Sequence, residues 1–180
     1  MASELKAFDF DHEKATEALL YVASKLPRDN ATFYIALKIL YLADKVHLSR
    51  YGRFVSGDNY VAMKHGPVPS GAYDIVKYVR GDGICSNPHA RNSFSIDRQT
   101  NQMSALREVD LGLFSESDVE CLDEVIGEHG SKPFPQIRKV SHDAAWDNAG
   151  DNEFISLEDI VKTLPDDEVL ADYLSDRYPG

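Results

Sequence analysis

Histidine is the first residue type in this sequence that could support chemistry, because imidazole binds metals and transfers protons near neutral pH. The chain carries six of them: His12, His47, His65, His89, His129 and His142. They fall on different predicted elements, and none forms an i, i+4 pair or an HExxH run, the spacings that bring two imidazoles to one face of a helix. The sequence therefore predicts no metal site.

Cysteine thiolates and paired carboxylates are the next candidates for catalysis. Cys85 and Cys121 share no CxxC spacing and have no adjacent histidine, so we expect two free thiols that are neither nucleophiles nor part of a disulfide framework. Glu116 and Glu120 are i, i+4 neighbours on a predicted helix, which needs them only for solvation. The nucleophile-elbow, P-loop and dinucleotide motifs are also missing from the sequence. We predict neither an enzyme nor a bound cofactor.

One acid stands out in an otherwise apolar helix. In residues 33–48, FYIALKILYLADKVHL, 12 of 16 positions are apolar or aromatic, which predicts a buried central helix that ends at Tyr51 and Gly52. Asp44 lies inside it and must be hydrogen-bonded if it is buried. We expect its carboxylate to accept backbone N–H groups from a neighbouring turn, with the turn after Tyr60 as the candidate.

A proline-rich stretch, YVAMKHGPVPS over residues 60–70, follows that helix. Its first residues predict a short strand. The glycine and the two prolines of 66–69 restrict their own backbone angles and those of their neighbours, which predicts a rigid corner rather than a catalytic loop. Ser70 is the expected N-cap of a helix that reaches Arg80.

The remaining elements follow from caps and periodicity. The expected elements are an N-terminal helix over 10–27 capped by Asp11, a hairpin over 94–106, a helix with the capping box Ser115 and Asp118, a proline-started helix that ends near 142–146, a helix with the capping box Ser156 and Asp159, and a last helix from Asp166. Trp146, the only tryptophan, is expected to fill the core while its indole N–H binds a buried acceptor.

Together these elements predict an α+β fold, a mostly α-helical single domain over 1–180 with a small antiparallel β-sheet or hairpin. The order of its elements is winged-helix-like. Its core should span about 31–148, with the N-terminal helix 10–27 and the C-terminal helices 156–178 packed on it. The N-terminus lacks a secretory signal pattern and no segment is apolar enough for a membrane span, so we expect a cytoplasmic protein that does not enter a membrane.

Charge is divided unevenly along the chain. Residues 1–90 carry 11 Lys and Arg against 10 Asp and Glu, whereas residues 91–180 carry 8 against 20. An acidic surface repels phosphate backbones and attracts basic proteins, although acidic helices also serve solubility alone. Nucleic acid is therefore not the expected partner.

The winged-helix order of elements nevertheless makes the helix over 70–80 a formal candidate for DNA recognition. Its cations Lys77 and Arg80 are accompanied by Asp74, which gives a poor phosphate-binding face. A transcriptional regulator stays as an alternative, and it would bind DNA through these two cations and through Arg91, Arg98 and Arg107.

A combination of short motifs now becomes informative. The sequence contains Leu40-Tyr41-Leu42-Ala43-Asp44, Tyr51-Gly52, Gly57 with Tyr60, Gly66-Pro67-Val68, Tyr73, and finally His142-Asp143 with Trp146. In this combination the chain closely resembles the Panacea domain, the SocA-like family found in bacterial and phage antitoxins. The resemblance covers roughly Phe33 to Trp146, about two-thirds of the chain.

The resemblance implies a function. It implies an antitoxin of a bacterial or phage toxin–antitoxin system, in phage defence among other settings, which neutralises the toxin encoded beside it by protein–protein contact. Family members are paired with unrelated toxins, including enzymes that act on nucleotides or tRNA. One SocA-type member is an adaptor that delivers its toxin to a protease, so proteolytic delivery is a further alternative.

The resemblance also separates scaffold from contact surface. Because one domain type meets many toxin folds, its shared residues should build the scaffold and variable surface should provide specificity. The expected scaffold residues are Tyr41, Asp44, Tyr51, Gly52, Tyr60, Gly66, Pro67, His142, Asp143 and Trp146. For the toxin contact we expect the hairpin surface and acidic residues of the later helices, namely Glu116, Glu120, Asp123, Glu124, Asp166, Asp167 and Glu168. The first 30 residues and those after Trp146 are equally open as specificity elements.

Overall fold

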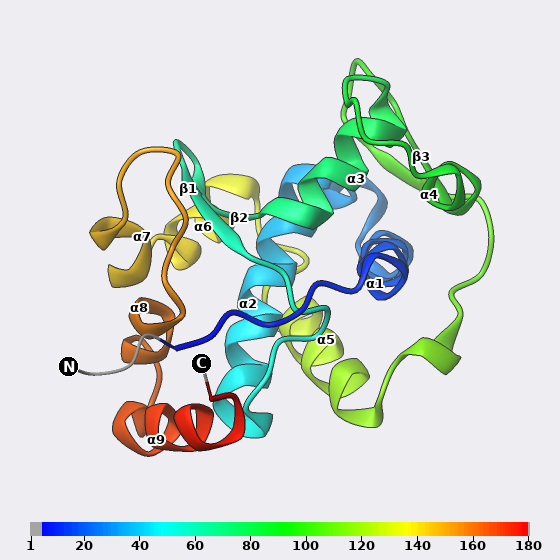
Figure 1. Cartoon of the computed structure of the whole chain (residues 1–180). Coiled ribbons are helices and arrows are strands. Elements are labelled where there is room, and N and C mark those ends of the chain that lie inside the picture. Colours follow the sequence, from blue (N-terminus) through cyan, green and yellow to red (C-terminus); the bar gives the residue numbers. More distant parts are fainter. Residues whose placement is uncertain (1–4, 180) are drawn as a thin grey trace.

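A single long helix, α2 (Phe33–Tyr51), runs through the centre of the computed structural model, which describes residues 5–179 (Figure 1). The other α-helices are α1 (His12–Lys25), α3 (Ser70–Arg80), α4 (Pro88–Ser93), α5 (Glu116–His129), α6 (Phe134–Ser141), α7 (Ala144–Asn148), α8 (Leu157–Lys162) and α9 (Asp167–Arg177), with 3-10 turns η1 (Arg28–Asn30) and η2 (Leu111–Leu113). The strands are β1 (Tyr60–Met63), β2 (Gly66–Pro69), β3 (Phe94–Ile96) and β4 (Met103–Ala105). The predicted class, a mostly helical α+β fold, is confirmed.

Helix α2 is buried on nearly every side, as its composition predicts. It packs against α1, α5, α6 and β2, and residues such as Ile39 and Ala43 are fully buried. The helix ends where Gly52 adopts a left-handed backbone with φ of 71° and donates its N–H to the carbonyl of Leu48. Both the central helix and its glycine cap are confirmed.

The predicted caps of α1 and α5 are also confirmed. Asp11 accepts the N–H of Lys14 at 3.0 Å, and Ser115 and Asp118 form a reciprocal capping box. Ser156 caps α8 by accepting the N–H of Asp159, but within residues 5–179 the return bond of a box is not formed there.

Asp118 also does more than cap a helix. It is buried, and it forms ion pairs with Lys14 at 2.7 Å and with Arg53 at 3.0 Å, while His47 lies 3.3 Å away. Burial alone would raise the pKa of this carboxyl, but its hydrogen bonds to His47 and Lys14 hold the pKa well below the usual range. This cluster links α1, α2 and α5.

The segment predicted to be a rigid corner is instead a strand. β2 pairs antiparallel with β1, so that Val61 lies opposite Val68 and Met63 opposite Gly66. On its other side β1 forms backbone hydrogen bonds with the segment before α8. The N–H of Ile155 donates to the carbonyl of Tyr60, and the N–H of Ala62 donates to the carbonyl of Glu153. β1 is therefore the middle strand of this small sheet.

The prolines fit the edge strand for a simple reason. Pro69 and Pro67 lie opposite Tyr60 and Ala62, and those two residues use their backbone groups for bonds to residues 152–155 on the other side of β1. Because hydrogen-bonded and non-hydrogen-bonded pairs alternate in an antiparallel ladder, both prolines are in non-hydrogen-bonded pairs. A residue at such a position needs no N–H, so proline costs no ladder hydrogen bond there. The prediction of a corner was wrong, because the restricted backbone angles of the glycine and the prolines also fit an extended edge strand.

The start of α3 also differs from the prediction. Ser70 is already inside the helix, and Pro69 at the N-cap has no side chain that could accept a bond. Asp58, eleven residues earlier on the loop before β1, instead accepts the N–H groups of Gly71 and Ala72, each at 2.8 Å. A buried carboxylate distant in sequence thus replaces the predicted serine cap.

The β3–β4 hairpin, predicted over 94–106, is confirmed and forms an arm with α4 and the end of α3 (Figure 1). The arm is fixed to α1 by a buried acid, since Arg107 forms an ion pair with Glu17 and the Glu17 carboxylate also accepts the N–H of Asp110. The short helix α4 before the hairpin was not predicted.

The two ends of the described chain meet on one face. Residues 5–11 cross in front of α2 and lie beside the end of α9 (Figure 1), where the Phe8 ring contacts Phe54 at 5.1 Å and Tyr178 at 5.4 Å between centroids. Gly57 permits this crossing, because it has φ of 72° and a Cβ there would lie 2.1 Å from the carbonyl oxygen of Asp9.

Candidate functional site

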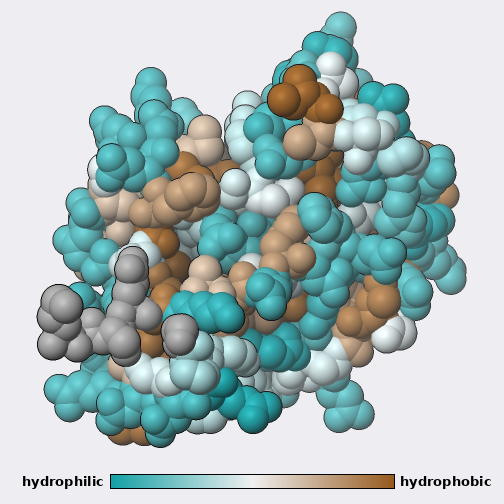
Figure 2. Space-filling view, in the orientation of Figure 1, coloured by the Kyte–Doolittle hydropathy of each residue, from teal (hydrophilic) through white to brown (hydrophobic). Residues whose placement is uncertain are grey.

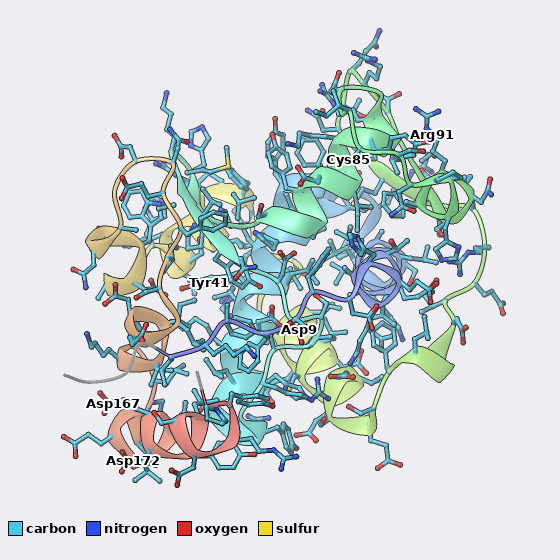
Figure 3. All side chains as sticks on the ribbon, viewed as in Figure 1. Asp9, Tyr41, Cys85, Arg91, Asp167 and Asp172 are labelled. Atoms are coloured by element: carbon cyan, nitrogen blue, oxygen red, sulfur yellow. The ribbon has the colours of Figure 1, made fainter. Side chains whose placement is uncertain are left out.

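Asp143 joins the central helix to the later part of the chain. As the N-cap of α7 it accepts the N–H of Trp146 at 3.1 Å, while its second carboxylate oxygen accepts the Tyr41 hydroxyl at 2.8 Å and the Lys45 ammonium at 2.7 Å. Burial, and then the charge of Asp143, raise the pKa of Tyr41 far above its usual range, so the hydroxyl stays a donor. Figure 3 shows Tyr41 deep among these elements.

Asp44 lies one helical turn further along α2 and is buried. Its carboxylate accepts the N–H of Val55 at 2.7 Å and the hydroxyl of Tyr60. The expected backbone bond therefore exists, but it comes from the turn before Tyr60 and not from the turn after it. Burial raises the pKa of Asp44, and the hydrogen bonds from Tyr60 and Val55 lower it in part; the resulting pKa is about 7.

His142 and Trp146 form the third part of the motif. Their rings stack at 4.0 Å with an angle of 11°, and the indole N–H of Trp146 donates to the carbonyl of Met63 at 2.9 Å. The proline-started helix ends at Ser141, so His142 lies in a corner and Trp146 on the separate helix α7. Burial first, and then Arg138 and Lys38, lower the pKa of His142, which favours a neutral ring.

Gly66 is the point at which these parts touch. It has φ of 104°, and a Cβ there would lie 2.9 Å from the His142 ring and 3.1 Å from Lys38 Nζ. Only glycine fits both the backbone and the space. The motif residues of α2, of the β1–β2 hairpin and of α6–α7 thus form one cluster that binds the chain to itself.

Lys38 belongs to this cluster although the motif did not indicate it. It is 3% exposed, and its ammonium donates to the carbonyl of Pro67 at 2.7 Å. Burial, and then the nearby Arg138, lower the pKa of Lys38 to about 7. The available sequence signal was a lysine in a helix that is apolar nearly all round.

Tyr51 and Gly52 lie apart from that cluster, at the other end of α2. There they line a groove of about 470 Å³ between α2 and α9, together with Arg50, Asp166, Val169 and Tyr173; we call it the α2–α9 groove. Tyr51, Val169 and Tyr173 are 44%, 71% and 49% exposed. A cluster of exposed large side chains is unusual on a surface that contacts only water.

The structure brings some residues of each predicted acidic set to this groove. From α5, Glu124 and Glu120 bind Arg50 at 2.7 and 3.2 Å, and Glu120 also accepts the Tyr51 hydroxyl at 3.0 Å. Asp166, the residue before α9, lines the groove itself, whereas Asp167 and Glu168 in the first turn of α9 line a neighbouring cavity between α9 and α8. The surface over α9 is largely hydrophilic, and Asp167 and Asp172 are labelled on it (Figures 2 and 3).

The other two acids of the first set lie differently. One carboxylate oxygen of Asp123 accepts a hydrogen bond from the Tyr21 hydroxyl. Glu116 is exposed in the first turn of α5. Neither lines the α2–α9 groove.

The cations on which DNA binding would depend are largely engaged within the chain. Lys77 binds Asp74, Arg80 and Arg98 both bind Asp82, Arg91 lies over the Tyr78 ring, and Arg107 binds Glu17. Paired cations attract phosphate less, so this geometry weakens the regulator alternative without testing it.

Within residues 5–179, no three His, Cys, Asp or Glu side chains gather as a metal site would require. None of the helices there has the length and apolar character needed to cross a membrane. Cys85 is exposed and Cys121 is buried, and both are free.

A mostly helical α+β domain whose motif residues hold its own elements together is the class of protein that this arrangement defines. The family model described as "Antitoxin SocA-like, Panacea domain" matches residues 37–147. The chain belongs to this family, which gives it an antitoxin role in general terms. No curated protein and no solved structure matches the chain.

Proposed function

We propose that this chain neutralises a cognate protein toxin in the cytoplasm by direct contact through the α2–α9 groove and its acidic rim. The observation that carries the proposal is the placement of exposed Tyr51, Val169 and Tyr173 in one groove, with Asp166 in its lining and Glu120 bonded to Tyr51. Aromatic residues in a pocket surrounded by a polar rim are typical of protein interfaces.

The charge of the rim indicates the kind of partner. Asp166, Asp167 and Glu168, which form no ion pair among the described residues, favour a partner with a basic surface, which they would attract over several ångströms before contact. Glu120 and Glu124 add less, because Arg50 pairs with both. An enzyme that acts on nucleotides or tRNA has such a surface where it binds phosphate. Covering that surface would inhibit the toxin without any chemistry by the antitoxin.

A co-expression growth assay with the toxin encoded beside this chain tests the proposal. Replacement of Asp166, Asp167 and Glu168 by lysine should abolish protection. Tyr173→Ala should raise the antitoxin level required for protection by at least tenfold. The matched control reverses the exposed acids Asp147, Asp151 and Glu153, which carry the same charge on another part of the surface. If the folded variant with Asp166, Asp167 and Glu168 reversed protects as well as the folded control variant, the proposal is contradicted.

Toxin half-life separates inhibition from proteolytic delivery. If contact alone neutralises, the toxin level should stay constant when the antitoxin is present, and the purified pair should form a stable inactive complex. A shorter toxin half-life would instead assign the adaptor role.

A further inference from the structure

A second cavity, distant from the α2–α9 groove, lies beside the motif cluster. It has a volume of about 250 Å³ and lies between the start of α2, the β1–β2 hairpin, α3 and α6. Four aromatic rings line it, those of Phe33, Tyr34, Tyr73 and Phe134. Tyr34 is 46% exposed, so the cavity opens to solvent at this ring. A concave site lined by rings and a few polar groups is typical of small-ligand sites.

Apart from the hydroxyls of Tyr34 and Tyr73, the polar side chains that line this cavity are basic. Lys38, Lys64 and His65 contribute to its lining, and none of the described residues that line it is an acid. Lys64 and His65 are exposed on the turn of the β1–β2 hairpin, whereas Lys38 is buried. The charge of the cavity therefore complements an anion.

Lys38 is a buried amine without a counter-ion. An ammonium has three donors, but among residues 5–179 the one acceptor for Lys38 is the carbonyl of Pro67, and no carboxylate lies within ion-pair distance. Its nearest charged neighbour, Arg138 on α6, is also basic, and His142 at the end of α6 lies against the same glycine. Burying such a group is costly unless it is paired.

We propose that this cavity binds a small aromatic carboxylic acid, whose ring packs among the aromatic side chains while its carboxylate forms the ion pair that Lys38 lacks. The apolar rings provide burial and Lys38 provides the selection for an anion. This cavity is separate from the proposed toxin-binding surface, so a negative result in the ligand-binding test would not contradict the proposed function.

The proposal has a consequence for pH. Because burial and Arg138 lower the pKa of Lys38 to about 7, the amine of the free protein is largely neutral above that pH. A bound carboxylate stabilises the ammonium, so binding takes up a proton and affinity falls as pH rises above 7. Lys64 and His65 line the cavity with Lys38, whereas Arg138 and His142 lie near the Lys38 amine outside that lining; none of the four provides a competing negative charge.

Titration of the full chain with 3-phenylpropanoate, followed by calorimetry, tests the site. We expect saturable binding at millimolar concentration or below, at least tenfold weaker binding of the neutral 3-phenylpropanamide, and a similar loss in Lys38→Met. Lys139→Met, which removes an exposed lysine of α6, is the matched control and should bind normally.

A measurement on the unaltered chain guards against a variant that does not fold. The NMR signal of the Lys38 Cε should titrate near pH 7 without ligand and at higher pH with saturating 3-phenylpropanoate. Equal binding of acid and amide, unchanged binding in a folded Lys38→Met, a Lys38 titration that the acid does not move, or no saturable binding at millimolar acid would each overturn the proposal.

Discussion

Asp44 is a buried acid whose charge opposes folding. Its ordinary pKa of 3.8 is raised to about 7 in the folded chain, chiefly by burial. A raised carboxyl pKa means that, between about pH 4 and pH 7, the folded chain still binds a proton that the unfolded chain has released. The free energy of unfolding therefore falls as pH rises through this range. The bonds from Val55 and Tyr60 reduce this cost without removing it.

Asp44→Asn should therefore be more stable than the original chain at pH 8, by about 1 to 3 kcal/mol, and nearly equal to it at about pH 4. The amide can still accept the N–H of Val55 and can donate to the Tyr60 oxygen. Urea unfolding at both pH values measures the difference. Asp44→Ala is the control, because it loses both bonds and should be destabilised at either pH; a pH-independent difference for Asp44→Asn would contradict the prediction.

Gly66 offers a test of the motif cluster. Gly66→Ala should lower the free energy of unfolding by about 2 kcal/mol or more, since alanine is strained at φ of 104° and its Cβ would contact the His142 ring. Gly127→Ala in α5 is the matched control: a Cβ there meets nothing within 4 Å, and helix propensity favours alanine by about 0.5 to 1 kcal/mol. Thermal unfolding compares both, and a stable Gly66→Ala would exclude this packing.

At the scale of single residues, the sequence predicted what a buried polar group needs but not always which group supplies it. Asp44 had to be hydrogen-bonded because burial demands it, yet Val55 could not be distinguished from residues after Tyr60 by spacing alone. Lys38 was counted as a mere interruption of an apolar helix. Its carbonyl partner, Pro67, is 29 residues away, and no local pattern shows such a contact.

At the scale of elements, the cap of α3 has the clearest energetic consequence. Asp58→Ala should destabilise the chain by about 2 kcal/mol, because the N–H groups of Gly71 and Ala72 lose their acceptor. In Asp58→Ala, hydrogen exchange should speed up more at the amides of Gly71 and Ala72 than at the other amides of α3. Ser70→Ala, the residue that local sequence suggests as the cap, should change stability by less than about 0.5 kcal/mol. The reverse ranking of the two variants would contradict this assignment.

Elements with a local signal could be predicted, and elements that depend on distant contacts could not. α1, α2 and α5 combine apolar periodicity with a side-chain cap or a terminal glycine, and all three were predicted close to their observed limits. β2 contains two prolines and is a strand only because β1 lies beside it. α4 and α7 are short, so their few residues give no periodicity.

At the scale of the whole molecule, the uneven charge predicts how association should respond to salt. If the acidic rim attracts a basic toxin, the association rate should fall on the order of tenfold between low ionic strength and about 0.5 M salt. Asp167→Asn with Glu168→Gln should reduce that dependence while leaving dissociation nearly unchanged. Stopped-flow mixing measures both rates. An association rate independent of salt would show that the acids serve solubility instead.

The whole-molecule role of the two acidic sets could be predicted only in part. The sequence shows how many acids the second half contains, and the family resemblance directs attention to surface residues. It does not show that Glu120 and Asp166 flank one groove, because residues of α5 and α9 meet there only through the end of α2. The exposed apolar residues of that groove, Tyr173 and Val169, could not be distinguished by sequence from the buried Leu174 of the same helix.

The contact of Phe8 with Tyr178 bears on when the molecule becomes active during its synthesis. The first described residues cannot reach their final position until the last ones have left the ribosome, although α1 and α2 are made early. The same last residues carry α9 and one side of the α2–α9 groove. The α2–α9 groove is therefore complete only once α9 has been synthesised and has packed against α2.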